Sequence, residues 1–274
     1  MSQLNSSGHS PIMLLPLLLV VASLWTAAAF DGNLVTVEEA RSNAVDSSSP
    51  PARIVGGSSA SLNQFPHQVA LLRQGSLFCG GSLITSKWVL TAAHCVYDGN
   101  QIVQPSLVTV LAGTVNLNQG GVRRSVRRII PHERYGNFRN DIAVMELQQA
   151  YQIGRSISTI TLRRTAVPNG STVTISGWGR LYNNGPLPNT LQYTRVTALS
   201  SLACARETGI NGGILCLRSP VNNGACNGDS GGPAVYNNQL VGVANFVING
   251  CGSSRPDGYA QVSDFVQWIE TRIN

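Results

Sequence analysis

Short apolar stretches rich in β-branched residues alternate with turn residues from residue 54 onward. The 28 Gly and 13 Pro of the chain supply residues for the turns. No long helical pattern separates the stretches, so the sequence predicts an all-β fold, either a barrel or a sandwich. Three stretches that read as strands are residues 107–111, 172–175 and 239–244.

The last residues of the chain have a different pattern. Phe265, Val266, Ile269 and Ile273 follow Ser263 at helical spacing. A serine hydroxyl can accept a hydrogen bond from a free backbone N–H in the first turn of a helix. The pattern therefore predicts a C-terminal helix with Ser263 as its N-cap.

The beginning of the chain is apolar enough to be a targeting segment. Residues 11–25 are almost entirely apolar, and the small residues 27–29 that follow suit cleavage near Phe30. A membrane anchor is the competing interpretation, but the run is close to the lower length limit for a span and is interrupted by Pro16. We therefore expect residues 1–29 to be a signal peptide and the protein to be secreted and extracellular.

Residues 30–53 differ from the rest in being acidic, rich in Ser and free of cysteine. Such a composition cannot bury a hydrophobic core. The segment ends in Pro50-Pro51-Ala52-Arg53. We expect it to be an exposed tether that leaves once it is cut, and residues 54–274 to form the folded domain.

Composition places the mature chain among globular proteins, with 43% hydrophobic and 12% charged residues overall. An even number of cysteines in an exported chain indicates disulfides, here three. Six cysteines allow 15 pairings, and spacing alone does not choose among them. The cysteines are Cys79, Cys95, Cys204, Cys216, Cys226 and Cys251.

The charge of the mature chain is strongly basic, with 17 basic residues (16 Arg and Lys87) against nine acidic ones after residue 53. Six of the arginines lie close together in the sequence. One interpretation is an exosite for acidic substrates or polyanions. The other interpretation, which we prefer, is that the arginines lie on a strand and loop exposed to solvent. The six are Arg123, Arg124, Arg127, Arg128, Arg134 and Arg139.

Three motifs in a fixed order carry the candidate chemistry. They are Thr91-Ala92-Ala93-His94-Cys95, Asn140-Asp141-Ile142-Ala143 and Gly228-Asp229-Ser230-Gly231-Gly232-Pro233. A serine hydroxyl needs a base to become a nucleophile, and a histidine base needs a third group to hold its tautomer. Over residues 54–274 the chain thus resembles the chymotrypsin/trypsin family of serine endopeptidases, in which a Ser-His-Asp triad performs the chemistry.

The resemblance implies two antiparallel six-stranded β-barrels with the catalytic residues in the cleft between them. His94 is expected as general base and later general acid, Asp141 as the orienting carboxylate and Ser230 as the nucleophile. The amides of Gly228 and Ser230 are expected to form the oxyanion hole. The mechanism needs no metal or cofactor, and residues 112–132 contain no acid with which to form the calcium loop of some relatives.

The resemblance also implies that residues 30–53 are an activation propeptide and residues 54–274 the mature serine protease domain. Cleavage after Arg53 by a trypsin-like protease creates a new ammonium group at Ile54, which pairs with the carboxylate of Asp229 and orders the site. The disulfides that the resemblance implies are Cys79–Cys95, Cys204–Cys216 and Cys226–Cys251.

The residues of the implied substrate pocket are unusual. Gly224 falls at the floor of the pocket, where trypsin-like relatives carry aspartate. Asn245, Phe246 and Val247 are expected to line one wall, and Val247 narrows the pocket as in elastases. Asp257 is expected on the opposite wall and, if accessible, admits Arg or Lys. The combination of Gly224 with Asp257 resembles arthropod chymotrypsin-like and collagenolytic proteases of broad specificity. We expect cleavage after small or medium apolar residues.

The expected partners are protein or peptide substrates, the activating protease, and serpin-type or small protein inhibitors. We expect a monomer that binds neither nucleic acid nor membranes. The alternative is a catalytically weak or inactive homologue that acts as a protein-binding module. Its support is Asn245, because the family nearly always has a serine there that bonds to the catalytic carboxylate. The amide of Asn245 can donate to Asp141 in its place.

Overall fold

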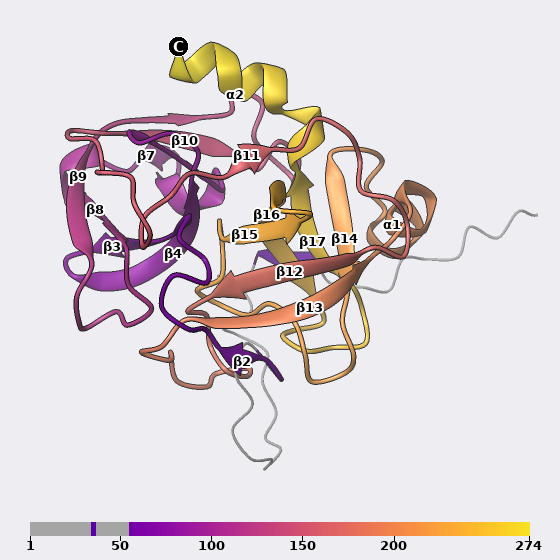
Figure 1. Cartoon of the computed structure of the whole chain (residues 1–274). Helices are drawn as coiled ribbons and strands as arrows, with labels where there is room; N and C mark the ends of the chain where they lie inside the picture. The colour runs from indigo at the N-terminus through magenta and orange to yellow at the C-terminus, as the bar shows by residue number, and fades with distance from the viewer. Residues whose placement is uncertain (1–33, 37–54) are drawn as a thin grey trace, which may run out of the picture.

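The computed structural model describes residues 34–36 and 55–274 of the chain. The expected signal peptide and the expected cleavage site after Arg53 lie outside these residues, as does most of the expected propeptide. The mature domain consists of two antiparallel β-barrels that stand side by side (Figure 1). This confirms the all-β fold with two six-stranded barrels and a C-terminal helix.

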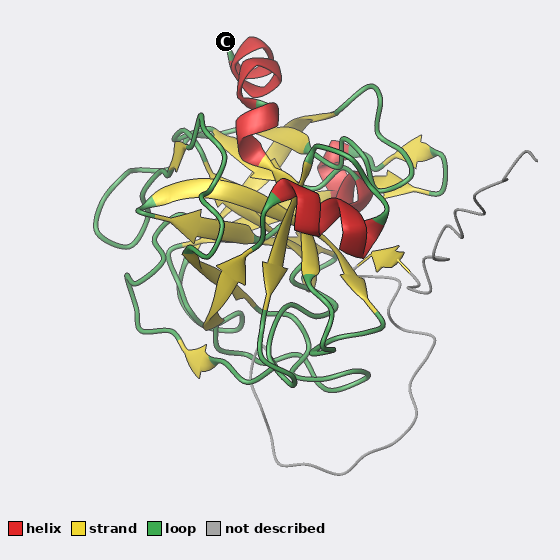
Figure 2. Cartoon of the chain, turned by 90° about the vertical axis from the view of Figure 1, so that its right-hand side faces the viewer, coloured by secondary structure: helices red, strands yellow, loops and turns green. Residues whose placement is uncertain are grey.

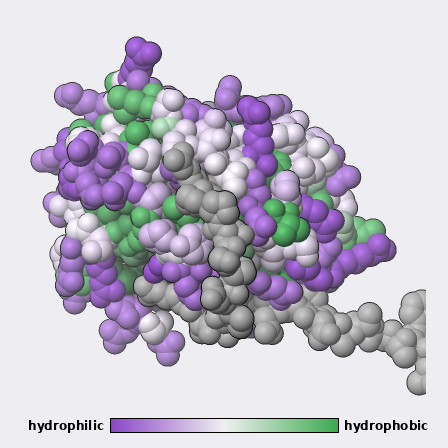
Figure 3. Space-filling model, turned by 90° about the horizontal axis from the view of Figure 1, so that it is seen from below, coloured by the Kyte–Doolittle hydropathy of each residue, from purple (hydrophilic) through white to green (hydrophobic). Residues whose placement is uncertain are grey.

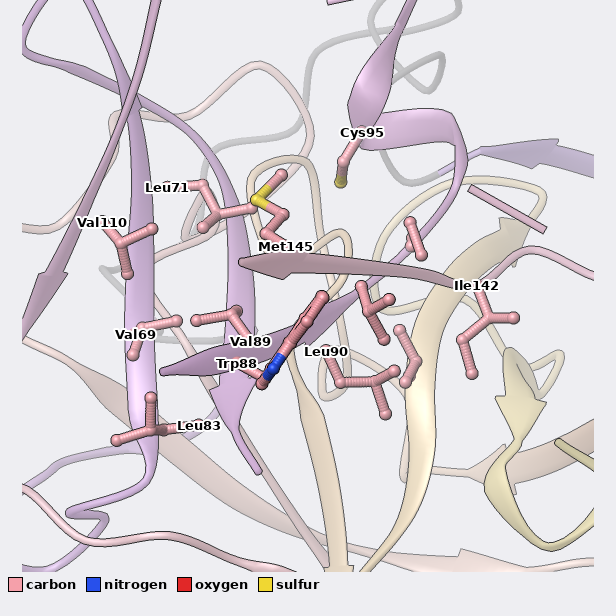
Figure 4. Close-up of a cluster of buried hydrophobic side chains, with 14 of the residues drawn as sticks. Val69, Leu71, Leu83, Trp88, Val89, Leu90, Cys95, Val110, Ile142 and Met145 are labelled. Carbon is pink, nitrogen blue, oxygen red and sulfur yellow. The ribbon is translucent and has the colours of Figure 1, made fainter. Parts of the chain in front are cut away.

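The first barrel is closed by six strands in the order β10-β5-β4-β3-β8-β9. Alternate residues of each strand point inward, and the inward-pointing residues are mostly apolar. Figure 4 shows side chains from several of these strands pointing toward one another, among them Leu71, Leu90 and Met145. The strands are β3 (Gln68–Arg73), β4 (Ser76–Leu83), β5 (Trp88–Thr91), β8 (Val108–Ala112), β9 (Val122–Pro131) and β10 (Ala143–Leu147).

The second barrel follows in the sequence, with the strand order β16-β15-β12-β13-β14-β17, and it closes by pairing of β16 with β17. The strand expected over residues 239–244 continues to Ile248. The strands are β12 (Thr172–Gly177), β13 (Gln192–Ala198), β14 (Ile214–Arg218), β15 (Pro233–Tyr236), β16 (Gln239–Ile248) and β17 (Asp257–Gln261).

Short strands lie outside the two closed barrels. Strand β11 pairs with β16, β2 pairs with β13, and β6 pairs with β7. Strand β1, the described part of the expected propeptide, pairs with β16. These strands are β1 (Leu34–Thr36), β2 (Ser58–Ser59), β6 (Tyr97–Asp98), β7 (Gln101–Ile102) and β11 (Thr161–Leu162).

The two α-helices are short and lie outside the barrels, as Figure 2 shows. The C-terminal helix begins later than the sequence pattern predicts. Ser263 lies in a 3-10 turn and its hydroxyl donates to Asp264, whereas Phe265 is the N-cap and caps without a side-chain bond. The helices are α1 (Ser201–Thr208) and α2 (Val266–Ile273), and the 3-10 turns are η2 (His94–Val96), η3 (Pro105–Leu107) and η4 (Val262–Asp264).

One hydrophobic cluster extends from the first barrel to the C-terminal helix, because Phe265 and Ile269 pack into it. A second cluster fills the interior of the other barrel. The surface seen from below is mostly hydrophilic, with separate apolar spots (Figure 3). No helix in the described part of the chain has the length and apolarity needed to span a bilayer.

All six cysteines are paired, and the pairs are those that the family resemblance implies: Cys79–Cys95, Cys204–Cys216 and Cys226–Cys251. The basic cluster on β9 makes specific contacts. Arg127 and Arg128, together with Lys87, lie 3.1–3.3 Å from the carboxylate of Glu146. These two arginines are therefore partners of a buried acid on the neighbouring strand.

Candidate active site

His94 and Asp141 come together because their strands are neighbours in the first barrel. Strand β5 ends at Thr91, which pairs with Ala143 at the start of β10. His94 follows β5 in the turn η2, and Asp141 lies just before β10. The Nδ1 atom of His94 lies 2.6 Å from Oδ2 of Asp141, and the backbone N–H of His94 donates to Oδ1 at 2.8 Å. Two bonds thus hold a buried carboxylate against the ring, and this favours the tautomer with a proton on Nδ1.

Ser230 reaches the same place from the second barrel, in the turn before β15. The backbone N–H of Gly80 in the first barrel donates to the carbonyl of Ser230 at 2.7 Å. Gly231 must be glycine, because its φ is +74° and a Cβ there would lie 2.1 Å from Oγ1 of Thr91. The turn that carries Ser230 is therefore packed directly against the strands that position His94.

Each expected oxyanion donor shares a peptide group with a carbonyl that is already hydrogen-bonded to another residue. The carbonyl of Asn227 accepts a bond from Arg180 N–H at 2.7 Å, and that of Asp229 accepts from Gly232 N–H at 2.8 Å. In a trans peptide the N–H points opposite to the C=O. The N–H groups of Gly228 and Ser230 therefore point away from these partners, which leaves both able to donate to a substrate oxygen.

Asp229 lies buried behind this turn. Its carboxylate accepts bonds from the N–H groups of Gly179 and Cys226, at 2.8 and 3.0 Å. Burial outweighs these bonds and raises the pKa of Asp229 to about 7. Val55 is buried nearby, and its carbonyl accepts a bond from Gly224 N–H at 3.1 Å. The residue after Ile54 is thus already anchored to the second barrel.

Gly179 gives a test of the space around Asp229. A Cβ on Gly179 would lie 2.3 Å from Oδ2 of Asp229, whereas a Cβ on Gly154 has open space. We expect Gly179→Ala to lower the free energy of unfolding by about 3 kcal/mol and to lower activity after cleavage, because Asp229 must move. Gly154→Ala is the matched control and should change neither. Chemical denaturation of both variants checks this, and equal stability of the two would contradict it.

The base of the expected pocket holds a buried acid. Gly224 has φ +127°, and a Cβ there would lie 2.6 Å from Oδ2 of Asp257 and 3.0 Å from Oγ of Ser219. Asp257 is 5% exposed, and its Oδ2 accepts a bond from Ala225 N–H at 2.9 Å. Burial, with a smaller contribution from Asp229, raises the pKa of Asp257 to about 8. The structure therefore brings Gly224 and Asp257 together, and burial shifts the carboxyl toward its neutral form.

The expected wall residues Asn245, Phe246 and Val247 are fully buried on β16. Val247 packs in the apolar cluster of the second barrel, which also contains Ala225 beside the pocket floor. The amide of Asn245 donates to the carbonyl of Phe138 at 2.9 Å. Its bond is therefore not to Asp141, whose two oxygens accept from His94.

Sequence reasoning missed several residues of the site. Phe138 has φ +60° and packs its ring on Phe246 at 5.3 Å, so it joins the loop before Asp141 to β16. A cavity of about 690 Å³ adjoins His94, and Arg73 and Tyr97 contribute to its lining. The motifs contain no signal for these residues, because their roles come from contacts between distant loops.

The two other described histidines have structural roles. Burial lowers the pKa of His67 to about 4. His132 accepts a bond from Arg134 N–H and stacks on Trp268 with ring centroids 5.0 Å apart. Among the described residues, His94 is therefore the histidine placed for proton transfer.

Two closed β-barrels, with the His94–Asp141 pair in one and the turn that carries Ser230 in the other packed against it, are the arrangement expected of a hydrolase with a serine nucleophile. Comparison with known proteins agrees. A family model described as Trypsin matches residues 54–269. The chain therefore belongs to the trypsin family and is a serine protease.

Individual relatives support this assignment. The chain is 63% identical over 222 residues to Serine protease SP24D of Anopheles gambiae, covering 81% of this chain and 82% of that protein. It is 37% identical over 227 residues to Brachyurin of Leptuca pugilator, covering 80% and 98%. Among solved structures it is similar to neuropsin, a serine protease expressed in the limbic system of mouse brain. The TM-score is 0.72 at 29% identity, covering 80% of this chain and 99% of that one.

Proposed function

We propose that this protein is a secreted serine endopeptidase made as a zymogen, which after cleavage behind Arg53 hydrolyses peptide bonds following small or medium apolar residues. The observation that carries the preference is the burial of Asp257 against Gly224, because burial disfavours a charged carboxylate at the base of the expected pocket. Three disulfides and the apolar leader support secretion.

The reaction proceeds through an acyl-enzyme. The Oγ of Ser230 attacks the carbonyl carbon while Nε2 of His94 takes the hydroxyl proton, and the Asp141 carboxylate stabilises the imidazolium. The N–H groups of Gly228 and Ser230 stabilise the oxyanion. The C–N bond breaks as His94 gives its proton to the amine. Water, deprotonated by His94, then cleaves the ester and restores Ser230.

Two features compete to set the preference before the cut bond. A charged Asp257 favours Arg or Lys, whereas Val247 favours small aliphatic side chains. With a pKa of about 8, Asp257 carries little charge at pH 7. A neutral acid offers a cation no ion pair, and a buried cation without a partner is costly. The apolar preference therefore follows.

Activation follows from the surroundings of Asp229. In the uncut chain its two described hydrogen bonds come from neutral backbone groups. The Oγ of Ser230 is buried and has no hydrogen-bond partner among the described residues, so the bond to His94 that activates it is not made. A new ammonium at Ile54, next to the anchored Val55, supplies the charge that Asp229 lacks and lowers its pKa.

The direct experiment is to cut the protein with trypsin, confirm Ile54 as the new N-terminus and remove the trypsin. Peptide substrates that differ only in the residue before the cut bond, namely Ala, Val, Leu, Phe and Arg, then give kcat/KM values. We expect Ala and Val to be cleaved best at pH 7. A preference for Arg at that pH would overturn the proposal for the pocket.

The charge of Asp257 predicts a pH-dependent preference. An acid with pKa about 8 is about a tenth ionised at pH 7 and about nine-tenths ionised at pH 9. We expect the ratio of kcat/KM for Arg to that for Val to rise about tenfold over this range, because only the carboxylate attracts Arg. Asp257→Asn should abolish the rise, and Glu270→Gln, at an exposed acid, should keep it. A flat ratio in the unmodified enzyme would contradict the prediction.

The alternative of a non-catalytic binding homologue has one feature in its favour, the bond of Asn245 to Phe138, which leaves its Oδ1 buried without a partner among the described residues. Labelling of Ser230 by a serine-directed covalent inhibitor separates the two. Labelling after cleavage supports the enzyme, and its absence together with no turnover supports the binding module.

A further inference from the structure

Strand β1 of the expected propeptide occupies the edge of β16 beside the active site. It pairs antiparallel with β16, with Leu34 opposite Ile248, Val35 opposite Val247 and Thr36 opposite Phe246. In Figure 2 it is a short strand joined to a grey trace at both ends. A segment expected to leave on activation thus pairs with two of the three residues expected to line one wall of the pocket.

This edge of β16 is available because β15 pairs only with the earlier residues of β16. Pairing between β15 and β16 begins at Pro233 and Val243. The next residue of β16, Ala244, is bonded to the Ser230 turn that precedes β15. Its carbonyl accepts from Gly231 N–H and its N–H donates to Gly232 carbonyl, both at 2.9 Å. The other edge of β16 is occupied by β17, with Phe246 opposite Gly258. Strand β1 therefore continues the line of β15 on the side where Ser230 lies.

The direction of β1 is that of a chain entering the catalytic site. From Ala244 to Ile248, β16 runs away from the Ser230 turn, so the antiparallel β1 runs toward it. Thr36 is the end of β1 nearest Ser230, and its partner Phe246 is two residues from Ala244. At the rise of a strand this is about 7 Å along β16.

We propose that the propeptide segment Leu34–Thr36 is a substrate-like ligand of β16 that covers the cleft of the uncut chain, and that the released propeptide inhibits the mature enzyme by adding this strand back. The proposal rests on the proposed zymogen function. Phe246, Val247 and Ile248 have no exposed surface because their side chains pack in apolar clusters of the second barrel, so β1 contacts this part of β16 through its backbone edge. The binding mode is addition of a strand to a sheet edge, in which backbone hydrogen bonds supply the affinity.

The test uses a synthetic peptide of residues 31–40 and the cut enzyme with an apolar peptide substrate. We expect the peptide to raise KM and leave kcat unchanged. In an antiparallel ladder, hydrogen-bonded and non-hydrogen-bonded pairs alternate. Prolines at both Val35 and Thr36 therefore remove the ladder donor, whichever pair carries it.

The double variant Val35→Pro/Thr36→Pro of the peptide should inhibit at least about tenfold more weakly. The control Val35→Ala/Thr36→Ala keeps both N–H groups and should stay within a few-fold of the parent peptide. Equal inhibition by the parent and the proline peptide, or none by the parent at about 1 mM, would overturn the proposal.

Binding is also measured without turnover, by calorimetry on cut Ser230→Ala enzyme from which the released peptide has been removed. If the unmodified enzyme cleaves no substrate while the peptide still binds the Ser230→Ala enzyme, the proposed function fails and the strand addition stands. If the enzyme is active and neither measurement detects the peptide, the strand addition alone fails.

Discussion

Replacing Ser230 with alanine will lower kcat of the cut enzyme by at least about 10⁴-fold, because the nucleophile of the acyl-enzyme route is lost while the oxyanion donors remain. The two donors belong to the backbone of residues 228 and 230, so the substitution leaves them in place. KM should change little, since substrate binding does not require the hydroxyl. Steady-state hydrolysis of an apolar peptide substrate measures both constants.

A matched control separates chemistry from packing. Ser82 is buried like Ser230, and its Oγ also has no hydrogen-bond partner among the described residues. Ser82→Ala should therefore keep kcat within a few-fold and retain labelling by a covalent inhibitor. If Ser230→Ala kept more than a hundredth of the activity, another group would have to be the nucleophile.

Arg53→Gln will keep the protein inactive after trypsin treatment, about 10³-fold below the cut enzyme. Without the cut there is no ammonium at Ile54, and Asp229 remains a buried acid whose hydrogen bonds among the described residues come from backbone groups. A buried ion pair that lacks one partner costs roughly 3–5 kcal/mol, which sets the size of the effect. The measurement combines the N-terminal sequence of the product with its kcat/KM.

The propeptide contains a natural control for this substitution. Arg41 is the other basic residue of residues 30–53. Arg41→Gln should be activated normally, because its cut does not free Ile54. Asp229→Asn tests the other partner and should be cut normally yet stay inactive. Full activity of an uncut preparation would refute the zymogen model.

The two acids behind the site respond to the same physical cause. Asp229 and Asp257 are both buried and both titrate well above the usual range of a carboxyl, at about 7 and about 8. The lower value belongs to the acid that accepts two backbone hydrogen bonds, and the higher to the acid that accepts one. In the proposed activation the new ammonium at Ile54 charges Asp229, and this adds to the expectation that Asp257 remains the neutral member of the pair near pH 7.

Much of this protein could be predicted from local sequence. The order of the motifs around His94, Asp141 and Ser230 was sufficient to indicate the family, and with it the two barrels and the three disulfides. Short apolar stretches rich in β-branched residues, separated by turn residues, predicted the strands, because a strand needs only a few residues. The start of the C-terminal helix was misplaced, because the hydroxyl of Ser263 bonds to Asp264 and a 3-10 turn intervenes.

Contacts between distant residues determined the rest. The protonation of Asp257 depends on burial against Gly224, the bond of Asn245 depends on a loop 107 residues away, and β1 pairs with a strand more than 200 residues later. A motif records which groups are present and in which order. Burial, hydrogen-bond partners and sheet edges arise only when the chain folds, and they decide which acid is charged and which edge is free to bind.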